Sequence, residues 1–166
     1  KCHEGAIPLI GGVSIFFSVL LASSLFVQES QTLNLYLISA TLILFIGVLD
    51  DRYDLSVRVR LVAQVIVASI LIFGAGFYLS SLGDIFYFFE FKLGYVGILV
   101  TVIAVIGCIN AFNMVDGIDG LAGMLSLVTF SSLALLFYRA DNDWFLIPLL
   151  FGAAIIAYLL FRLPRP

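Results

Sequence analysis

Three carboxylates crowd together where an apolar stretch ends, in the segment Leu49-Asp50-Asp51-Arg52-Tyr53-Asp54. On a helix, Asp50 and Asp54 would share a face, and Asp51 would point about 100° away. Like charges at this spacing repel one another, and at the C-terminal end of a helix they also oppose the helix dipole. This double cost indicates a compensating cation, and a hard divalent ion such as Mg²⁺, held by carboxylates and substrate phosphates, would supply it. The alternative is a solvated loop that only ends the helix.

A second polar motif begins 56 residues after Asp54, where Asn110, Asn113, Asp116 and Asp119 recur every three residues. If this segment is helical, the four side chains form one polar stripe. Its neighbours are apolar, so the stripe begins at membrane depth, where polar and ionisable groups are costly and usually functional. Interspersed glycines would let a ligand approach or let the helix break. The alternative is a glycine-rich turn whose Asn side chains bond between helices.

The elements that carry these motifs are expected to be membrane-spanning helices. Hydrophobic residues make up 63% of the 166 residues and charged residues 11%, and the mean hydropathy is +1.19. A soluble domain is less apolar and about a quarter charged. Six apolar stretches are long enough for helical spans, and the weak alternation of a membrane barrel strand is absent. The predicted fold is therefore an all-α polytopic transmembrane helical bundle with about six spans, at about 11–27, 33–49, 60–79, 96–112, 120–138 and 144–161.

Composition and motif searches exclude several classes of function. The net charge is −3 and no basic run exists, so no nucleic-acid partner is expected. Cys2 and Cys108 do not have the spacing of metal ligands, and P-loop, dinucleotide-binding and zinc-protease motifs are missing. Residues 84–92 are too short to span and are expected to form a hairpin or an interfacial segment. Residues 1–166 are interpreted as a single integral-membrane domain that is incomplete at both ends.

Successive spans cross the membrane in alternating directions, and this parity of the spans places both carboxylate motifs on one side of the membrane. That side also collects six of the eight basic residues, against two on the other side. Because cytoplasmic loops carry an excess of Lys and Arg, the first side is predicted to be cytoplasmic. The first set is Lys1, Arg52, Arg58, Arg60, Arg162 and Arg165, and the second is Lys92 and Arg139.

Three motifs then match a known family in order and spacing. They are Lys1 to Gly12 (Lys-Cys-His-Glu-Gly-Ala-Ile-Pro-Leu-Ile-Gly-Gly), Asp50 to Asp54 (Asp-Asp-Arg-Tyr-Asp) and Asn110 to Gly120 (Asn-Ala-Phe-Asn-Met-Val-Asp-Gly-Ile-Asp-Gly). With them the chain resembles the polyprenyl-phosphate N-acetylhexosamine-1-phosphate transferases, of the glycosyltransferase family 4 type, over essentially its whole length. The first motif and Asp54 are closer to the WecA branch than to the MraY branch, which usually has Thr-Pro-Thr-Met-Gly-Gly and Lys at these places.

The resemblance implies an enzyme of cell-surface polysaccharide synthesis, including that of lipopolysaccharide. Such an enzyme transfers N-acetylglucosamine 1-phosphate from UDP-N-acetylglucosamine to undecaprenyl phosphate and releases UMP. The implied cofactor is Mg²⁺, or Mn²⁺ in its place. The implied location is the bacterial inner membrane, with the active-site loops in the cytoplasm. The implied partners are a UDP-N-acetylhexosamine, a polyprenyl phosphate and the membrane, and homo-oligomerisation is left open.

The resemblance also implies roles for residues at matching positions. Asp50 and Asp51 would lie beside the metal and the lipid phosphate, and Lys1 and His3 would border the nucleotide-sugar site. The implied catalytic residues are Asp50, Asp51, Asp116 and Asp119; the implied substrate-binding residues are Asn110, Asn113, Lys1 and His3; the implied metal ligands are Asp51, Asp116 and Asp119.

The chain departs from the family pattern in one respect. Family members carry a later Gly-Asp-x-Gly-Ser loop and a later His-rich loop, and neither occurs in these 166 residues. The chain by itself is therefore expected to be inactive, and the implied activity belongs to the intact protein. Three alternatives remain open: the phospho-N-acetylmuramoyl-pentapeptide transferase reaction, a cation-coupled membrane transporter, and a non-catalytic membrane scaffold.

Overall fold

Helices satisfy their own backbone hydrogen bonds, which is why a chain this apolar can cross lipid in helical form. The computed structural model describes residues 10–83, 90–115 and 120–162. Within these ranges the chain is helical, apart from connecting segments and one isolated antiparallel bridge. The elements are α1 (Ile10–Phe26), α2 (Gln31–Tyr53), α3 (Val57–Ser69), the π-helical η1 (Ile70–Gly74), α4 (Val96–Val115), α5 (Leu121–Arg139), the 3₁₀ turn η2 (Asp143–Phe145) and α6 (Leu146–Arg162).

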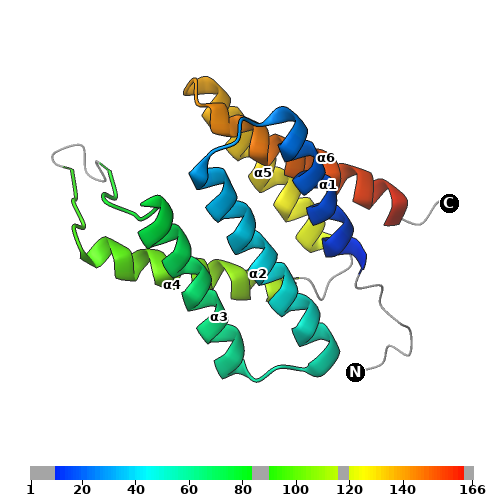
Figure 1. Ribbon diagram of the computed structural model, residues 1–166, viewed down its shortest axis with the longest axis horizontal. Coiled ribbons are helices and arrows are strands. Elements are labelled where there is room, and N and C mark those ends of the chain that lie inside the picture. The colour runs from blue at the N-terminus through cyan, green and yellow to red at the C-terminus, as the bar shows by residue number, and fades with distance from the viewer. Residues whose placement is uncertain (1–9, 84–89, 116–119, 163–166) are drawn as a thin grey trace. The chain divides into compact units, whose positions relative to one another are not determined.

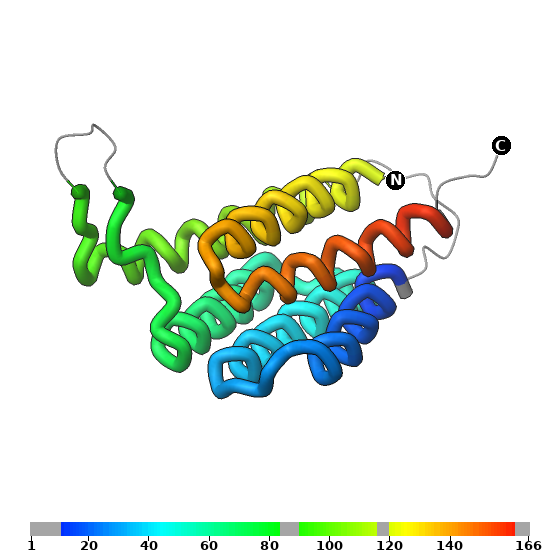
Figure 2. The backbone as a smooth tube through the Cα atoms, turned by 90° about the horizontal axis from the view of Figure 1, so that it is seen from above, coloured from blue at the N-terminus to red at the C-terminus, as the bar shows by residue number. Residues whose placement is uncertain are grey.

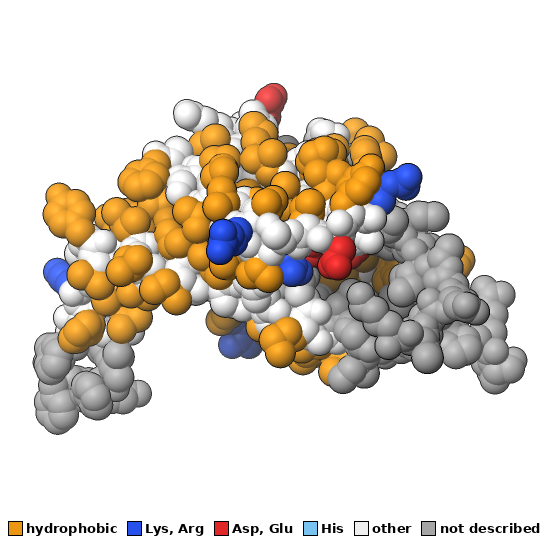
Figure 3. Space-filling model, turned by 90° about the horizontal axis from the view of Figure 1, so that it is seen from below, with side chains coloured by type: hydrophobic (Ala, Val, Ile, Leu, Met, Phe, Trp, Pro, Cys, Tyr) orange, Lys and Arg blue, Asp and Glu red, His pale blue; other side chains and the backbone are white. Residues whose placement is uncertain are grey.

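The predicted all-α membrane bundle is confirmed. In the described ranges, five helical segments are long and apolar enough to cross a membrane, and α1 is a shorter apolar helix. Large apolar side chains lie on the outside: Leu21, Leu99 and Leu136 are each more than 60% exposed. Figure 3 shows hydrophobic side chains over much of one face, with few charged groups between them. A surface of this kind is stable in lipid.

Two helix ends differ from the predicted spans by a full turn or more. Helix α2 continues to Tyr53, one turn beyond the predicted end at residue 49, so Asp50 and Asp51 lie on the helix itself. The third span was predicted to reach residue 79, but its helical part ends at Gly74. Gly76 follows with a φ of 72°, a left-handed conformation that glycine adopts readily and that ends a helix.

Residues 84–92 were predicted to form a hairpin or an interfacial segment, and the described residues around positions 81 and 92 pair as antiparallel neighbours. Ser81 pairs with Lys92 in an antiparallel bridge. The Leu82 N–H donates to the Phe91 carbonyl (3.0 Å), and the Leu93 N–H donates to the Ser80 carbonyl (2.9 Å). Residues 84–89 lie outside the described residues.

The helices form two compact units, one of Lys1–Gln28 with Val115–Pro166 and the other of Glu29–Met114. The single domain stays a prediction. In the first unit α6 packs beside both α1 and α5 (Figures 1 and 2). Phe130 of α5 stacks on Phe151 of α6 with ring centroids 4.9 Å apart. Gly123 of α5 lies so close to Leu159 of α6 that an added Cβ would be 2.9 Å from its Cδ2. Small residues of this kind let membrane helices approach closely.

In the second unit α2 and α3 run antiparallel, joined by the short turn at Asp54–Ser56, and α4 crosses α3 (Figure 1). The first turn of α4 is fixed to the segment that follows η1. The Leu79 N–H donates to Thr101 Oγ1 (2.9 Å), and the Thr101 hydroxyl donates to the Gly97 carbonyl (2.7 Å). A Cβ added at Gly97 would overlap the Leu79 carbonyl oxygen. The close approach of two backbones therefore requires glycine at this position.

We expect Gly97→Ala to destabilise the protein by about 1–3 kcal/mol, the usual cost of forcing extra atoms into a packed contact. The matched control is Gly107→Ala in the same helix, because a Cβ there meets no atom within 4 Å. The control should be neutral or slightly stabilising, since alanine is the better helix former. Thermal unfolding of the full-length protein in detergent measures both, and equal effects of the two substitutions would contradict the close contact.

Candidate active site

The first acidic motif occupies the last turn of α2. Asp50 and Asp51 lie within the helix, and Asp54 ends it in a left-handed conformation with a φ of 51°. The Asp54 N–H donates to the Asp50 carbonyl oxygen at 2.8 Å, which closes the helix end. Asp51 is exposed, whereas the Asp50 side chain keeps only 18% of its surface accessible. The two neighbouring carboxylates are thus held in different surroundings.

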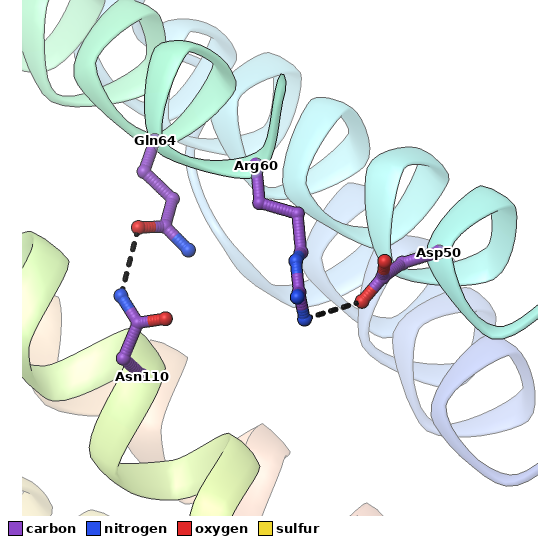
Figure 4. Close-up of polar contacts among 4 residues, drawn as sticks. All are labelled: Asp50, Arg60, Gln64 and Asn110. Atoms are coloured by element: carbon purple, nitrogen blue, oxygen red, sulfur yellow. Dashed lines mark hydrogen bonds and ion pairs between the residues drawn. The ribbon is translucent and has the colours of Figure 1, made fainter. Parts of the chain in front are cut away.

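Asp50 is paired with a cation from the next helix. Arg60, in the first turn of α3, places Nη1 3.0 Å from Asp50 Oδ2 (Figure 4). The Arg60 side chain is 31% exposed, so this ion pair is largely shielded from water. Among the described residues, Asp50 Oδ1 and Arg60 Nε are buried and have no hydrogen-bond partner. Arg60 therefore provides part of the positive charge that the crowded carboxylates require, and Asp50 keeps one oxygen for a further donor or cation.

Helix α3 also contacts the second motif, through Asn110. Asn110, near the C-terminal end of α4, donates from Nδ2 to Gln64 Oε1 at 3.0 Å and to the Ile106 carbonyl at 2.8 Å. Gln64 is only 4% exposed. A buried amide without a hydrogen bond is costly. This contact gives a partner to the Gln64 amide on α3 and to the Asn110 amide on α4.

Arg60 and Gln64 are one turn apart on α3, so their side chains leave the same face of the helix. Figure 4 shows Arg60 reaching toward Asp50 of α2 and Gln64 toward Asn110 of α4. Asp50, in the last turn of α2, and Asn110, near the end of α4, therefore each contact a side chain on this face of α3. The membrane side that span parity predicted for Asp50, Asp51 and Asp54 together with Asp116 and Asp119 stays a prediction, because Asp116 and Asp119 lie outside the described residues.

The remaining predicted residues are only partly described. Asn113 is exposed in the last turn of α4, one turn beyond Asn110. Lys1, His3, Asp116 and Asp119 lie outside the described residues. Among the described residues, no three His, Cys, Asp or Glu side chains come together as a metal-binding group. Of the predicted metal ligands the structure therefore describes Asp51, whose hard carboxylate oxygen atoms are of the type that Mg²⁺ prefers.

Sequence reasoning missed Gln64. A signal for it existed, because Gln64 is an amide within an otherwise apolar run and lies four residues after Arg60. Polar residues in spanning helices usually face the bundle interior and find partners there. The identity of the partner could not be read from the sequence, since Asn110 is 46 residues away.

Comparison with known proteins decides the family. The model of glycosyl transferase family 4 matches residues 33–165, which is most of the chain and includes both motifs described above. The chain belongs to glycosyl transferase family 4. The resemblance drawn from the three motifs is confirmed. No solved structure matches the chain.

Relatives from several bacteria carry the same name, undecaprenyl-phosphate alpha-N-acetylglucosaminyl 1-phosphate transferase. The protein of Yersinia pestis is 44% identical over 86% of this chain, and that of Haemophilus influenzae is 45% identical over 84%. The protein of Escherichia coli K12 is 41% identical over 61% of the chain. The matches span 39% of the first two relatives' length and 28% of the third's. These names favour neither the muramoyl-pentapeptide reaction nor a transporter.

Removing the cation that pairs with Asp50 is expected to destabilise the protein. Arg60→Met leaves a largely buried carboxylate without its partner, which should cost roughly 1–3 kcal/mol. Arg58→Met is the matched control, because Arg58 lies on the same helix, is exposed and stands outside this ion pair. An exposed substitution of this kind should change stability by no more than about 0.5 kcal/mol. Chemical or thermal unfolding in detergent tests the difference, and indistinguishable variants would refute it.

Proposed function

We propose that the intact protein transfers N-acetylglucosamine 1-phosphate from UDP-N-acetylglucosamine to undecaprenyl phosphate. The observation that carries this proposal is the 44% identity, over 86% of the chain, to a relative named for this transfer. The fold supports it, because a long polyprenyl chain stays in the bilayer and its phosphate must be met at the membrane surface. Helix ends that carry carboxylate and amide groups suit that position.

In the proposed reaction, an oxygen of the lipid phosphate attacks the β-phosphorus of the nucleotide sugar. The bond from that phosphorus to the oxygen bridging the two phosphates breaks, and UMP leaves. The product is a polyprenyl diphosphate sugar in the membrane. Phosphoryl transfer of this kind requires positioning and charge neutralisation more than covalent catalysis. A phosphate monoester has a second pKa of about 6, so the attacking group is already largely ionised at neutral pH.

The chain's own residues would take complementary parts in this reaction. Asp50 or Asp51 would position the lipid phosphate, and Asn110 and Asn113 would bind the nucleotide sugar. Arg60 keeps a positive charge beside Asp50 and so lowers the repulsion between that carboxylate and an approaching phosphate. Lys1 and His3 would border the nucleotide-sugar site.

Three carboxylates, Asp51, Asp116 and Asp119, would hold Mg²⁺, or Mn²⁺ in its place. The bound ion would neutralise charge on the diphosphate during transfer. Carboxylates without such an ion would repel the anionic substrates, which is the physical reason for expecting a divalent cation here. We further infer that these helix ends face the cytoplasm of a bacterial inner membrane, because most Lys and Arg residues fall on their side.

The direct test is an assay of the full-length protein in detergent or liposomes with radiolabelled UDP-N-acetylglucosamine and undecaprenyl phosphate. Label should appear in the lipid fraction together with UMP in equal amounts, and chelation of divalent cations should stop the transfer. Parallel assays with UDP-N-acetylgalactosamine and UDP-N-acetylmuramoyl-pentapeptide test the sugar. Transfer of the muramoyl-pentapeptide alone, or cation uptake without any transfer, would overturn the proposal.

Asp116→Asn should reduce turnover of the full-length enzyme by at least a hundredfold. The substitution keeps the size of the side chain and removes the negative charge that would bind the metal ion. The measurement is the initial rate over a range of Mg²⁺ concentrations. Near-normal turnover at ordinary Mg²⁺ would exclude Asp116 as a metal ligand.

A further inference from the structure

The amide orientation of Asn110 follows from its two contacts. The Ile106 carbonyl oxygen can only accept a hydrogen bond, so the Asn110 atom facing it at 2.8 Å must be the nitrogen Nδ2. The same nitrogen faces Gln64 at 3.0 Å, so Gln64 must present its oxygen Oε1. Both amide hydrogens of Asn110 are therefore directed at protein acceptors.

The consequence concerns the other end of the amide. With Nδ2 engaged, Asn110 can offer a ligand only its oxygen Oδ1, which accepts and cannot donate. Both of the Asn110 hydrogen bonds described above use Nδ2, and Figure 4 shows Oδ1 turned away from Gln64. Asn110 is thus prepared to receive an N–H or O–H group.

Gln64 is buried and close enough to fix the orientation of the Asn110 amide. It is 4% exposed, and it leaves α3 on the face that also carries Arg60. A long amide side chain loses considerable conformational freedom when it is buried, and in an apolar helix an aliphatic residue would fill the same space without a polar group. Its burial is compensated by the hydrogen bond from Asn110.

We propose that Gln64 is a positioning residue for the transfer reaction. It holds the Asn110 amide so that Oδ1 faces the nucleotide sugar and accepts from one of its hydroxyl or amide groups. This inference rests on the proposed function and names a residue that acts through Asn110 without touching the substrate. Gln64 and Arg60 together make α3 the element that orients a side chain from each of the two motifs.

The test compares variants of the full-length enzyme in the radiolabel assay. Gln64→Met keeps the length of the side chain but offers no acceptor, and it should raise the KM for UDP-N-acetylglucosamine about tenfold, as expected for one lost hydrogen bond. The KM for undecaprenyl phosphate should stay within about twofold. Gln64→Glu retains an acceptor oxygen and should restore much of the affinity for the nucleotide sugar. A merely structural role would lower thermal stability and the active fraction, and would leave KM unchanged.

Two further variants make the outcome decisive. Gln64→Asn keeps an amide but is one methylene shorter, so it tests the bond even if Gln64→Met does not fold. In the Asn110→Ala background, Gln64→Met should have no further effect on KM, because the residue through which it acts is gone. The matched control is Ser39→Ala, since Ser39 is also buried on a spanning helix and has no partner among the described residues.

The results separate this inference from the proposed function. Active wild-type enzyme with an unchanged KM in both Gln64→Met and Gln64→Asn would overturn the positioning role alone. KM increases that multiply in the double variant would also overturn it. Wild-type enzyme that transfers no sugar phosphate would overturn the proposed function and with it the role assigned here. In that case a stability cycle between Gln64 and Asn110 would still test their hydrogen bond.

Discussion

Pairing of polar side chains within an apolar bundle is the constraint on which the second unit depends. Lipid cannot hydrogen-bond a carboxylate or an amide, so each such group near a spanning segment needs a partner on a neighbouring helix. Helix α3 provides two partners one turn apart, Arg60 for Asp50 and Gln64 for Asn110. The same two contacts stabilise the arrangement of three helices and set the directions of groups that belong to the candidate active site. The same two contacts therefore contribute to both the stability of the fold and the geometry of the candidate active site.

The two units are held together internally by different forces. In the first, α5 and α6 associate through the stacked rings of Phe130 and Phe151 and through a close contact at Gly123. This is dispersion packing, which acts in lipid as it does in water. In the second, polar contacts carry more of the specificity. The chemistry-bearing residues described here belong to the second unit, where directional bonds can fix the orientation of a side chain.

Much of this could be predicted from the sequence. The helices follow from apolar runs of the right length. The shared membrane side of the two carboxylate motifs was inferred from span parity and stays a prediction. The end of α2 was placed one turn too early because a charged pair looks like a loop, whereas Asp50 and Asp51 continue the helix. The third span was placed too late because apolar residues continue after Gly76, whose left-handed conformation is a matter of backbone geometry.

Side-chain partners are a different kind of information. Periodicity tells which residues share a face of their own helix, but it does not tell which helix that face meets. The repulsion among the carboxylates predicted a compensating cation, and Arg60 provides positive charge beside Asp50. The metal ion itself stays a prediction. Gln64 was overlooked because its role exists only through Asn110. The roles of Asp116, Asp119, Lys1 and His3 stay predictions from the family resemblance.

The attachment of α4 has a mechanical consequence. Within the described chain Gly97 is the only buried residue of this helix, so α4 gains little from apolar contact with its own unit. It is tied at two points instead, by Thr101 to Leu79 near its start and by Asn110 to Gln64 near its end. These anchors are nine residues apart, about 14 Å along the axis. Two such points oppose sliding and rolling of the helix, while the residues between them are exposed or half-buried and can contact lipid tails.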